Sequence, residues 1–368
     1  MTTHTGLHTT GWVGVVILNY NGWSDTIECL ESLLRLSTPR ITVVVCDNGS
    51  TDESLKQIRH WAAGRVHAPT SPFLEIARCT QPPVPKPVHL VEMRPEQLSG
   101  LAAAALPPQT VLLVQNGQNL GFAAGNNPAL GWFASDPSIS HAWVLNNDTV
   151  VTPSALSAMV RRLGERPDAG LCGSRLLHYH APGSVQALGG LRYNRWLGSA
   201  SAITMTSPAS DRDVERVVEQ AMDMVHGASV LVSRQFLRGV GPLAEDYFLY
   251  SEEIDWAERG RRAGFSLAYA HDAIVYHKEG AAIGTSGDPY RRSWVSDFYA
   301  VRSRLRVAAK FYPATLPGVY LGLGAVVLNR LRRGQFDRAI MVLRVALSPA
   351  SYRPHRGDTP PHLDRSWR

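Results

Sequence analysis

Continuous apolar runs alternate with helical patterns in the first half of this chain, and this alternation limits the possible folds more than any other feature. Residues 13–18 (VGVVIL) and 41–46 (ITVVVC) are uncharged and β-favouring. Between them, residues 23–36 show apolar side chains at helical spacing after a candidate cap, Ser24 or Asp25. Strands that are apolar throughout are buried on both faces. The order therefore predicts an α/β fold, with a mostly parallel, Rossmann-like central sheet and helices on both faces.

Two further strands are predicted at residues 111–114 (VLLV) and 141–145 (HAWVL). Ser50 and Glu53 have capping-box spacing for a helix after the strand at 41–46. Residues 66–109 contain nine of the 24 prolines, so we expect an irregular or partly disordered insertion there.

Polar side chains follow the apolar strands at the points where these strands end. Asn19 and Asp47 follow the first two strands, and Asn146, Asn147 and Asp148 follow the strand at 141–145. In open α/β sheets the carboxyl ends of the strands form the edge where ligands bind. Turn formation alone explains any one of these clusters, but not their repetition after successive strands. We therefore expect a ligand site at this edge.

A glycine- and asparagine-rich loop, NLGFAAGNN, follows the strand at 111–114 and adds Asn119, Gly121 and Asn126 to the candidate ligand-binding residues. Glycine permits close approach of a ligand to the backbone. The first strand-to-helix turn, NYNGWS, contains neither G-x-G-x-x-G nor a P-loop, so backbone amides are not arranged there to hold phosphates. A hard cation, Mg²⁺ or Mn²⁺, held by Asp148 and the phosphates themselves, is the simplest way to neutralise a diphosphate.

The C-terminal region is basic and contains an apolar segment. Residues 288–368 hold 15 Lys and Arg against five Asp, although the whole chain has a net charge of only +6. Residues 311–328 are uncharged but contain two prolines and three glycines, which makes them a poor membrane-spanning helix. Two interpretations stay open: peripheral attachment to anionic lipid, or a helical tail packed on the protein.

The cysteine spacing and the N-terminal sequence help to predict the cellular compartment of the protein. The four cysteines form no C-x-x-C pair, which favours a reduced, intracellular setting and argues against a thiolate metal site. The first 16 residues lack the pattern of a secretory signal. We expect a cytoplasmic protein, with the inner face of the cell membrane as a further option.

Seven segments in order carry a resemblance to a known family. They are VVILNYNG, VVVCDNGSTDES, NLGFAAGNN, VLNNDTVV, HGASVLVSR, EDYFLYSEEIDWAERGRRAGF and VYHKEG. Together they resemble family 2 inverting glycosyltransferases, particularly rhamnosyltransferase-like members that act on bacterial surface glycans. The resemblance implies a GT-A fold, a nucleotide-diphosphate sugar donor such as dTDP-rhamnose, and a glycan or lipid-linked acceptor.

The resemblance also implies a division of the chain. Residues 11–285 would form the GT-A domain, with 11–150 binding the nucleotide sugar and 151–285 binding the acceptor. For the rest of the chain, the residues themselves lead us to expect a helical, basic tail over 286–350 that could associate with a membrane, and disorder over 351–368.

The same resemblance assigns roles to individual residues. Asp47 would contact the nucleobase or ribose. Asn146 stands where many relatives have the first aspartate of D-x-D, and Asp148, at the last position, would bind the metal. His277 matches a histidine that approaches the metal or diphosphate in some relatives. Because Asn146 replaces an aspartate, one metal ligand of the D-x-D pattern is missing.

An acidic pair, Glu252 and Glu253, follows Ser251, which is a plausible N-cap for a helix that runs to about Arg262 and ends at Gly264. Acids are common at helix N-termini because of the helix dipole, so the pair alone does not require a catalytic role. In the resembling family the second acid of this motif is the general base, which corresponds to Glu253, and Glu252 remains an alternative.

Three other functional classes fit the sequence less well. A sugar nucleotidyltransferase would need a basic, glycine-rich triphosphate loop near the first strand, which the sequence lacks. A non-catalytic nucleotide-sugar or glycan-binding module would not need either glutamate. A nucleic-acid partner is not expected, because the basic residues cluster in the tail without a recognition motif.

Overall fold

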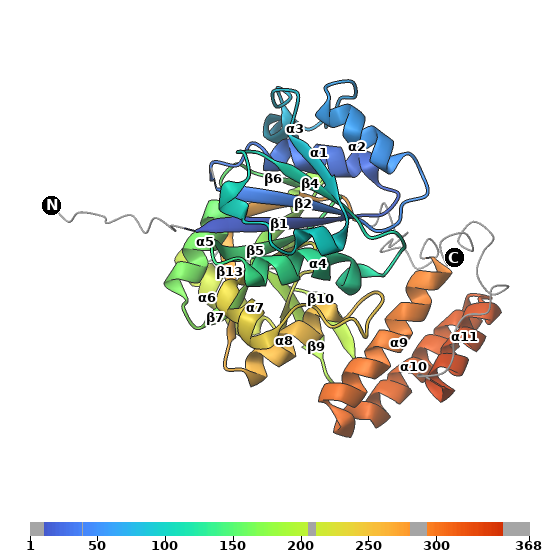
Figure 1. The fold of residues 1–368 in the computed structure, drawn as a ribbon. Coiled ribbons are helices and arrows are strands. Elements are labelled where there is room, and N and C mark those ends of the chain that lie inside the picture. Colours follow the sequence, from blue (N-terminus) through green and yellow to red (C-terminus); the bar gives the residue numbers. More distant parts are fainter. Residues whose placement is uncertain (1–10, 39, 205–210, 280–292, 349–368) are drawn as a thin grey trace.

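The computed structural model describes residues 11–38, 40–204, 211–279 and 293–348 (Figure 1). The segment 351–368, for which the sequence predicts disorder, lies outside these residues.

A ten-stranded mixed sheet forms the centre of the molecule. Its strand order is β3-β4-β2-β1-β5-β12-β7-β13-β6, with β8 paired to β7. The strands are β1 (Trp12–Asn19), β2 (Ile41–Asp47), β3 (Leu90–Met93), β4 (Val111–Gln115), β5 (Ile139–Asn146), β6 (Thr149–Val151), β7 (Ala169–His178), β8 (Ala181–Leu188), β12 (Ser229–Ser233) and β13 (Ser266–His277). Strands β3, β4, β2, β1 and β5 are parallel, and β12 runs antiparallel between β5 and β7. The predicted α/β class with a mostly parallel sheet is confirmed.

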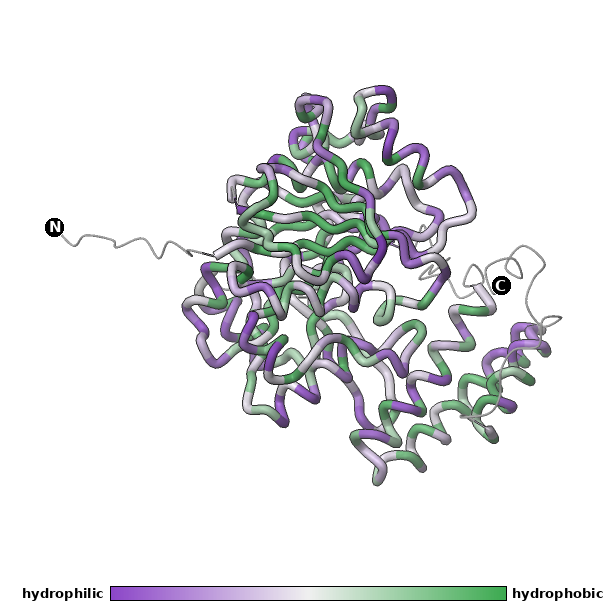
Figure 2. The backbone as a smooth tube through the Cα atoms, viewed as in Figure 1, coloured by the Kyte–Doolittle hydropathy of each residue, from purple (hydrophilic) through white to green (hydrophobic). Residues whose placement is uncertain are grey.

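Helices cover both faces of this sheet, as the fully apolar strands require (Figure 1). The main helices are α1 (Trp23–Leu33), α2 (Ser54–Ala62), α4 (Phe122–Ser135), α5 (Ala155–Glu165), α6 (Asp211–Ala221), α7 (Arg234–Val240) and α8 (Glu252–Arg262). Alternate residues of β1 serve the two faces: Val15 and Ile17 pack with α1, α2 and α5, whereas Val16 packs with α4. The strands form the continuous apolar band in Figure 2.

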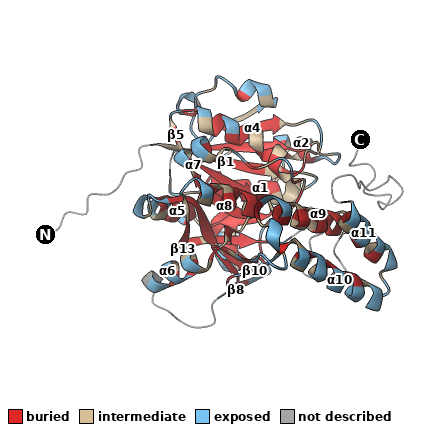
Figure 3. Ribbon diagram, turned by 90° about the horizontal axis from the view of Figure 1, so that it is seen from below, coloured by how far each residue is buried: buried red, intermediate tan, exposed pale blue. Residues whose placement is uncertain are grey.

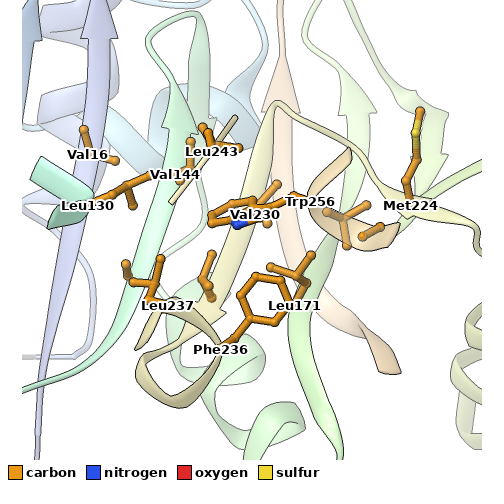
Figure 4. Packing of buried hydrophobic residues seen from close by; sticks show 14 of the residues in the cluster. Val16, Leu130, Val144, Leu171, Met224, Val230, Phe236, Leu237, Leu243 and Trp256 are labelled. Atoms are coloured by element: carbon orange, nitrogen blue, oxygen red, sulfur yellow. The ribbon is translucent and has the colours of Figure 1, made fainter. Parts of the chain in front are cut away.

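The core on the α4 face is completed by α7 and α8. Phe236 of α7 packs edge-on against Trp256 of α8, with ring centroids 5.6 Å apart. Both side chains are buried with Leu171 and Val230 of the sheet (Figure 4). This packing fixes α8, and with it the acidic pair, against the sheet.

Segment 66–109 is more regular than its proline content suggests. It contains α3 (Leu74–Thr80), β3 and two short 3₁₀ helices, η1 (Pro95–Leu98) and η2 (Ala103–Ala105). Strand β3 forms one edge of the sheet, and α3 packs near β6 at the other end of the strand order. The prolines fall mainly between these short elements, where no ladder hydrogen bond is lost. The expected irregular structure is found between these elements, and the correction concerns the short elements themselves, which are ordered and join the fold.

The tail consists of α9 (Trp294–Phe311), η3 (Pro313–Thr315), α10 (Leu316–Arg332) and α11 (Phe336–Leu347), which lie beside the main body (Figure 1). These helices lie within the segment for which a helical tail is predicted. Asp297 of α9 accepts hydrogen bonds from Arg330 of α10, at 2.7 Å, and Arg338 of α11, at 2.5 Å. This buried carboxylate joins the three helices.

A second, small sheet has the order β10-β9-β11, formed by β9 (Gly190–Asn194), β10 (Ser199–Ala202) and β11 (Met224–Val225). Strand β9 follows β8 after Gly189, and the β9–β10 hairpin extends toward the tail helices.

The predicted helix caps differ from the observed ones. Helix α1 starts after Gly22, and α2 starts after Glu53 without a side-chain cap. Ser50 does not cap α2, because its hydroxyl oxygen already accepts from Asn19 Nδ2 and from the Asn21 amide, both at 3.0 Å, and its hydrogen is donated to Asp47 at 2.6 Å. Because Ser50 belongs to the polar network at the carboxyl ends of β1 and β2, it does not accept hydrogen bonds from the first amides of α2.

Candidate active site

The carboxyl ends of β1 and β2 are joined by a buried polar network. Asn19 Nδ2 donates to Asp47 Oδ1 at 2.8 Å, and Asn19 Oδ1 accepts from Thr26 Oγ1 at 2.8 Å. The Ser50 amide donates to Asp47 Oδ2 at 3.1 Å. Asn19 and Asp47 are 0% and 2% exposed, so the network fixes the floor of this edge rather than offering freely accessible side chains.

Asn48, the residue after Asp47, holds the predicted glycine-rich loop against the sheet. Its Nδ2 donates to Asn119 Oδ1 at 3.0 Å, and its Oδ1 accepts from the Leu120 amide at 3.2 Å. Gly121 has φ +83°, and a Cβ there would lie 2.5 Å from the carbonyl oxygen of Phe248. Glycine is thus required at 121 for backbone packing, apart from any ligand.

Asn126 and Asn147 are also engaged within the protein. Asn126 lies inside α4, is 0% exposed, and donates to the Phe122 carbonyl at 2.8 Å. Asn147 Nδ2 donates to Gly22 O at 3.2 Å and to Thr26 Oγ1 at 3.1 Å. Both residues support the edge, whereas Asn146 ends β5 with a partly exposed side chain.

Asp148 and His277 lie together, as the predicted metal pair requires. His277 Nε2 is 3.3 Å from Asp148 Oδ1, and both side chains are only 7% exposed. His277 Nδ1 is 3.0 Å from Gln186 Oε1, an oxygen that accepts a hydrogen bond, so Nδ1 carries the hydrogen. Nε2 is then the ring nitrogen that faces the Asp148 carboxylate.

The orientation of His277 suits a divalent cation. A ring nitrogen held by an outer oxygen presents the other nitrogen as a ligand, which is the usual arrangement in metal sites. Within the described parts of the chain, no group of three or more His, Cys, Asp or Glu side chains is arranged to hold a metal. A cation held by Asp148 and His277 would have to take its remaining ligands from a bound diphosphate or from water.

The turn from His226 to Ala228 connects this pair with the acidic pair. The rings of His226 and His277 are 5.9 Å apart, edge to face. The Ala228 carbonyl accepts from the Asn146 amide at 3.0 Å, which joins the turn to the end of β5. Burial, with a smaller contribution from His277, lowers the pKa of His226 to about 3, so His226 is neutral at physiological pH.

Gly227, within this turn, lies directly against Glu253. A Cβ built on Gly227 would be 1.9 Å from Glu253 Oε1, so the carboxylate occupies the space that any larger residue would need. Asp148, His277, His226, Gly227 and Glu253 thus form one continuous series of neighbours. The structure brings the predicted metal ligands and the predicted base to the same region.

The two glutamates have different surroundings. Glu252 is 1% exposed and its Oε1 has no hydrogen-bond partner among the described residues, whereas Glu253 is partly exposed. Burial raises the pKa of both carboxyls, and the neighbouring charge of Glu253 raises that of Glu252 further. Glu253 is therefore the more accessible of the two acids.

The residues before the acidic pair have an unusual backbone. Tyr250 and Ser251 have φ values of +66° and +74°, in the left-handed region, and Ser251 precedes α8 without making the predicted side-chain cap. Non-glycine residues in this region cost about 1–2 kcal/mol each. Helix α9 holds the segment: Ser303 Oγ donates to the Leu249 carbonyl at 2.9 Å, and the Tyr250 hydroxyl contacts Ser296 Oγ.

Several residues of this region were not identified from sequence. Thr26 and Ser50 orient Asn19 and Asp47, and their roles follow only from the packing of α1 and β2. Gln186 lies on β8 in the sequence APGSVQAL, which carries no recognisable signal. Its contact with His277 depends on a strand pairing that the sequence did not predict.

Comparison with family models identifies two consecutive matches. Residues 14–73 match the model described as glycosyl transferase family 2, and residues 75–292 match the model described as glycosyltransferase like family 2. The second match alone covers more than half of the chain.

One curated relative is an N-acetylglucosaminyl-diphospho-decaprenol L-rhamnosyltransferase from Mycobacterium tuberculosis. It is 27% identical over 194 residues, which cover 49% of this chain and 62% of the relative. The alignment thus spans less than two thirds of that protein.

Two solved structures show the same fold at low sequence identity. A mannosyltransferase from Pyrobaculum calidifontis in complex with GDP-Man and Mn²⁺ has a TM-score of 0.51 at 14% identity, covering 94% of this chain and 89% of its own. GalNAc-T7 with UDP, GalNAc and Mn²⁺ also has a TM-score of 0.51, at 13% identity, covering 84% and 49% respectively. The fold shared with these transferases is GT-A, as the sequence resemblance implies.

Proposed function

The chain belongs to glycosyltransferase family 2, and from this premise we propose that it is an inverting, metal-dependent hexosyltransferase. It would move a sugar from a nucleotide-diphosphate donor to a hydroxyl group of a glycan or lipid-linked acceptor. The observation that supports the proposal is the series of neighbours Asp148–His277–His226–Gly227–Glu253, which connects the two candidate metal ligands with the candidate base.

Donor binding is proposed at the carboxyl edge of β1, β2, β4 and β5. The network of Asn19 and Asp47 would form the floor of the nucleotide site, and the loop around Asn119 and Gly121, with Asn146, would form its walls. Asn126 and Asn147 would hold this edge in place from within the protein. Asp148 and His277 would hold Mg²⁺ or Mn²⁺, which neutralises a diphosphate and stabilises its charge as the bond to the sugar breaks. Gln186 would keep the His277 nitrogen directed toward this position.

Glu253 would act as the general base. Its carboxylate would accept the proton of the acceptor hydroxyl while that oxygen forms a bond to the anomeric carbon, and the nucleoside diphosphate would leave from the opposite face of the sugar. A single displacement inverts the anomeric centre without a covalent enzyme intermediate. Partial exposure favours Glu253 over the enclosed Glu252, and a raised pKa brings a carboxylate closer to the range suited to proton transfer.

The identity of the relative suggests the substrates. Its name specifies L-rhamnose transfer to a lipid-diphosphate-linked N-acetylglucosamine. We extend this to dTDP-rhamnose as donor and a lipid-linked acceptor in cell-surface polysaccharide synthesis at the cytoplasmic side of the membrane. The proposed division is a GT-A domain over 11–285, comprising donor and acceptor halves on either side of residue 150, and a tail over 286–350.

A sugar nucleotidyltransferase and a non-catalytic binding module are the alternatives. Incubation with a panel of nucleotide sugars, Mn²⁺ and lipid-linked or glycan acceptors, and separately with nucleoside triphosphates and sugar 1-phosphates, followed by mass analysis, separates the three. Transfer releases nucleoside diphosphate, nucleotidyl transfer releases pyrophosphate, and a binding module releases neither. Thermal stabilisation by one donor of the panel, lost in Asp148→Ala, would connect the site to donor binding.

A further inference from the structure

Exposed apolar side chains are concentrated on one part of the molecule. Of the 12 large hydrophobic residues that are exposed in the described chain, eight lie on α10 and α11 and two at the β9–β10 hairpin tip. These ten residues, which we call the apolar tail face, are Trp196, Leu197, Tyr320, Leu321, Leu328, Leu331, Phe336, Ile340, Leu343 and Leu347. Figure 3 shows the exposed outer surface of α10 and α11, which extend away from the buried sheet.

On helix α11 the exposed apolar side chains follow a regular helical spacing. Phe336, Ile340, Leu343 and Leu347 recur at i, i+4, i+7 and i+11, and they are 62%, 49%, 48% and 83% exposed. The opposite side of the helix is apolar too, because Ala339, Met341, Val342 and Val345 pack on α9 and α10. A helix on a protein surface needs only one apolar side to pack, so the second side requires another partner.

The hairpin tip continues this surface. A Cβ on Gly318 of α10 would lie 2.6 Å from the Trp196 carbonyl oxygen, and one on Gly322 would lie 3.6 Å from Leu197 Cδ2. The hairpin therefore rests directly on α10, yet Trp196 and Leu197 remain 63% and 44% exposed. Tryptophan at the rim of an apolar surface is typical of membrane interfaces.

The charges of the tail identify the partner. Residues 313–348 contain five arginines and one acid, Asp337. Arg330 and Arg338 are used by Asp297, but Arg332 and Arg344 are exposed beside the apolar tail face. A two-fold contact with a second copy would bring these cations together with few acids to match them, whereas anionic lipid complements them.

We propose that the apolar tail face docks onto the surface of an anionic lipid bilayer. Attachment is peripheral, although residues Pro313–Arg332 are long and apolar enough to span a membrane by length and composition. The inner side of α10, through Val319, Leu323 and Val327, packs in the tail core, and Arg330 is bound to Asp297. Spanning would break both contacts. The inference deepens the proposed function, because a bilayer would present a lipid-linked acceptor.

The test is flotation of the full chain with vesicles of phosphatidylcholine, with or without about one third phosphatidylglycerol. Wild type is expected to float with the anionic vesicles. Leu343→Gln and Leu347→Gln should each lower the partition coefficient about tenfold, since each removes one inserted apolar side chain. Arg344→Glu should lower it several-fold in anionic vesicles only.

Matched controls are Leu74→Gln on α3, where the leucine is 62% exposed, and Arg65→Glu, where the arginine is exposed far along the chain from the tail. Both should float as wild type does. Absence of wild-type flotation, or equal flotation of all variants, would overturn the proposal. So would a dimer in light scattering that Leu343→Gln dissociates without any vesicle binding.

Donor-induced thermal stabilisation, measured without vesicles, separates this proposal from the proposed function. The tail variants should retain it in full. Vesicle binding without donor binding would support the proposed membrane docking and contradict the proposed function. Donor binding without vesicle binding would support the proposed function and contradict the proposed membrane docking.

Discussion

Replacement of Gly227 by alanine tests the proposed site through its geometry. The new methyl group would lie 1.9 Å from Glu253 Oε1, whereas an ordinary contact begins near 3.4 Å. The carboxylate must therefore retreat by about 1.5 Å. Since Gly227 does not have a positive φ, alanine is compatible with its backbone.

The expected effect is on the rate rather than on donor binding. A displacement of about 1 Å at a reacting group can cost about 100-fold in rate, equivalent to about 2.7 kcal/mol of transition-state stabilisation. The moving atom ends a flexible side chain, so the free energy of unfolding should fall by no more than about 1–3 kcal/mol. Gly164→Ala, in helix α5 with no atom within 4 Å of the added group, is the control and should leave the rate unchanged.

The assay combines kcat, from nucleoside diphosphate release in the presence of acceptor, with donor affinity from thermal shift and stability from urea unfolding. Glu253→Asp, which withdraws the carboxylate by about one bond, provides a double-mutant cycle. Gly227→Ala should lower the rate much less in that background than in wild type. A wild-type kcat for Gly227→Ala, or full additivity in the cycle, would refute the reasoning.

Three further outcomes are expected. Glu253→Gln should lower kcat by at least about 100-fold with donor affinity unchanged, and a wild-type kcat in this variant would exclude Glu253 as the base. Gln186→Leu should weaken Mn²⁺ affinity about 10–100-fold by releasing His277; calorimetric titration in the presence of donor measures this, and unchanged affinity would exclude the pair as ligands. Burial raises the folded-state pKa of Glu252 above 4.5, so its neutral form favours the folded protein. This contribution to the free energy of unfolding is fully present below pH 4.5 and is lost as pH rises through the folded-state pKa. Urea unfolding should therefore show Glu252→Gln gaining stability over wild type as pH rises, and parallel pH profiles would contradict the assignment of a neutral Glu252.

The strands in the first half of the fold could be predicted because each one is a continuous apolar run in the sequence. Residues 13–18 and 41–46 are apolar without interruption, and both lie in buried parallel strands. The short helices and the strand within segment 66–109 were not predicted, because a high proline content indicates loops but does not reveal short elements between those loops. The antiparallel insertion of β12 between β5 and β7 depends on pairing between distant residues, which no local pattern reveals.

The same distinction applies to the site. The positions of Asp148 and Glu253 followed from strand ends and from family resemblance, and the structure brings both toward the turn at Gly227. Their catalytic and metal-binding roles remain predictions. The enclosure of Asp47 by Asn19 and Ser50 could not be foreseen, because it depends on how neighbouring loops close over the strand ends.

The two interpretations of the tail, packing on the protein and peripheral attachment to lipid, do not exclude each other. Leu323 of α10 is 2% exposed and Leu321 is 77% exposed, so one helix both packs on the protein and presents an apolar surface outward. Periodicity detects apolar positions, but it does not tell which of two apolar sides meets the protein.

The left-handed pair Tyr250–Ser251 has a practical consequence for anyone shortening this protein. Its braces, Ser296 and Ser303, belong to α9, which is itself tied to α10 and α11 through Asp297. A version trimmed before residue 293 would keep the nucleotide edge intact but leave the peptide leading into the acids free to relax. We therefore expect the smallest working transferase to include all three terminal helices, even for a water-soluble acceptor.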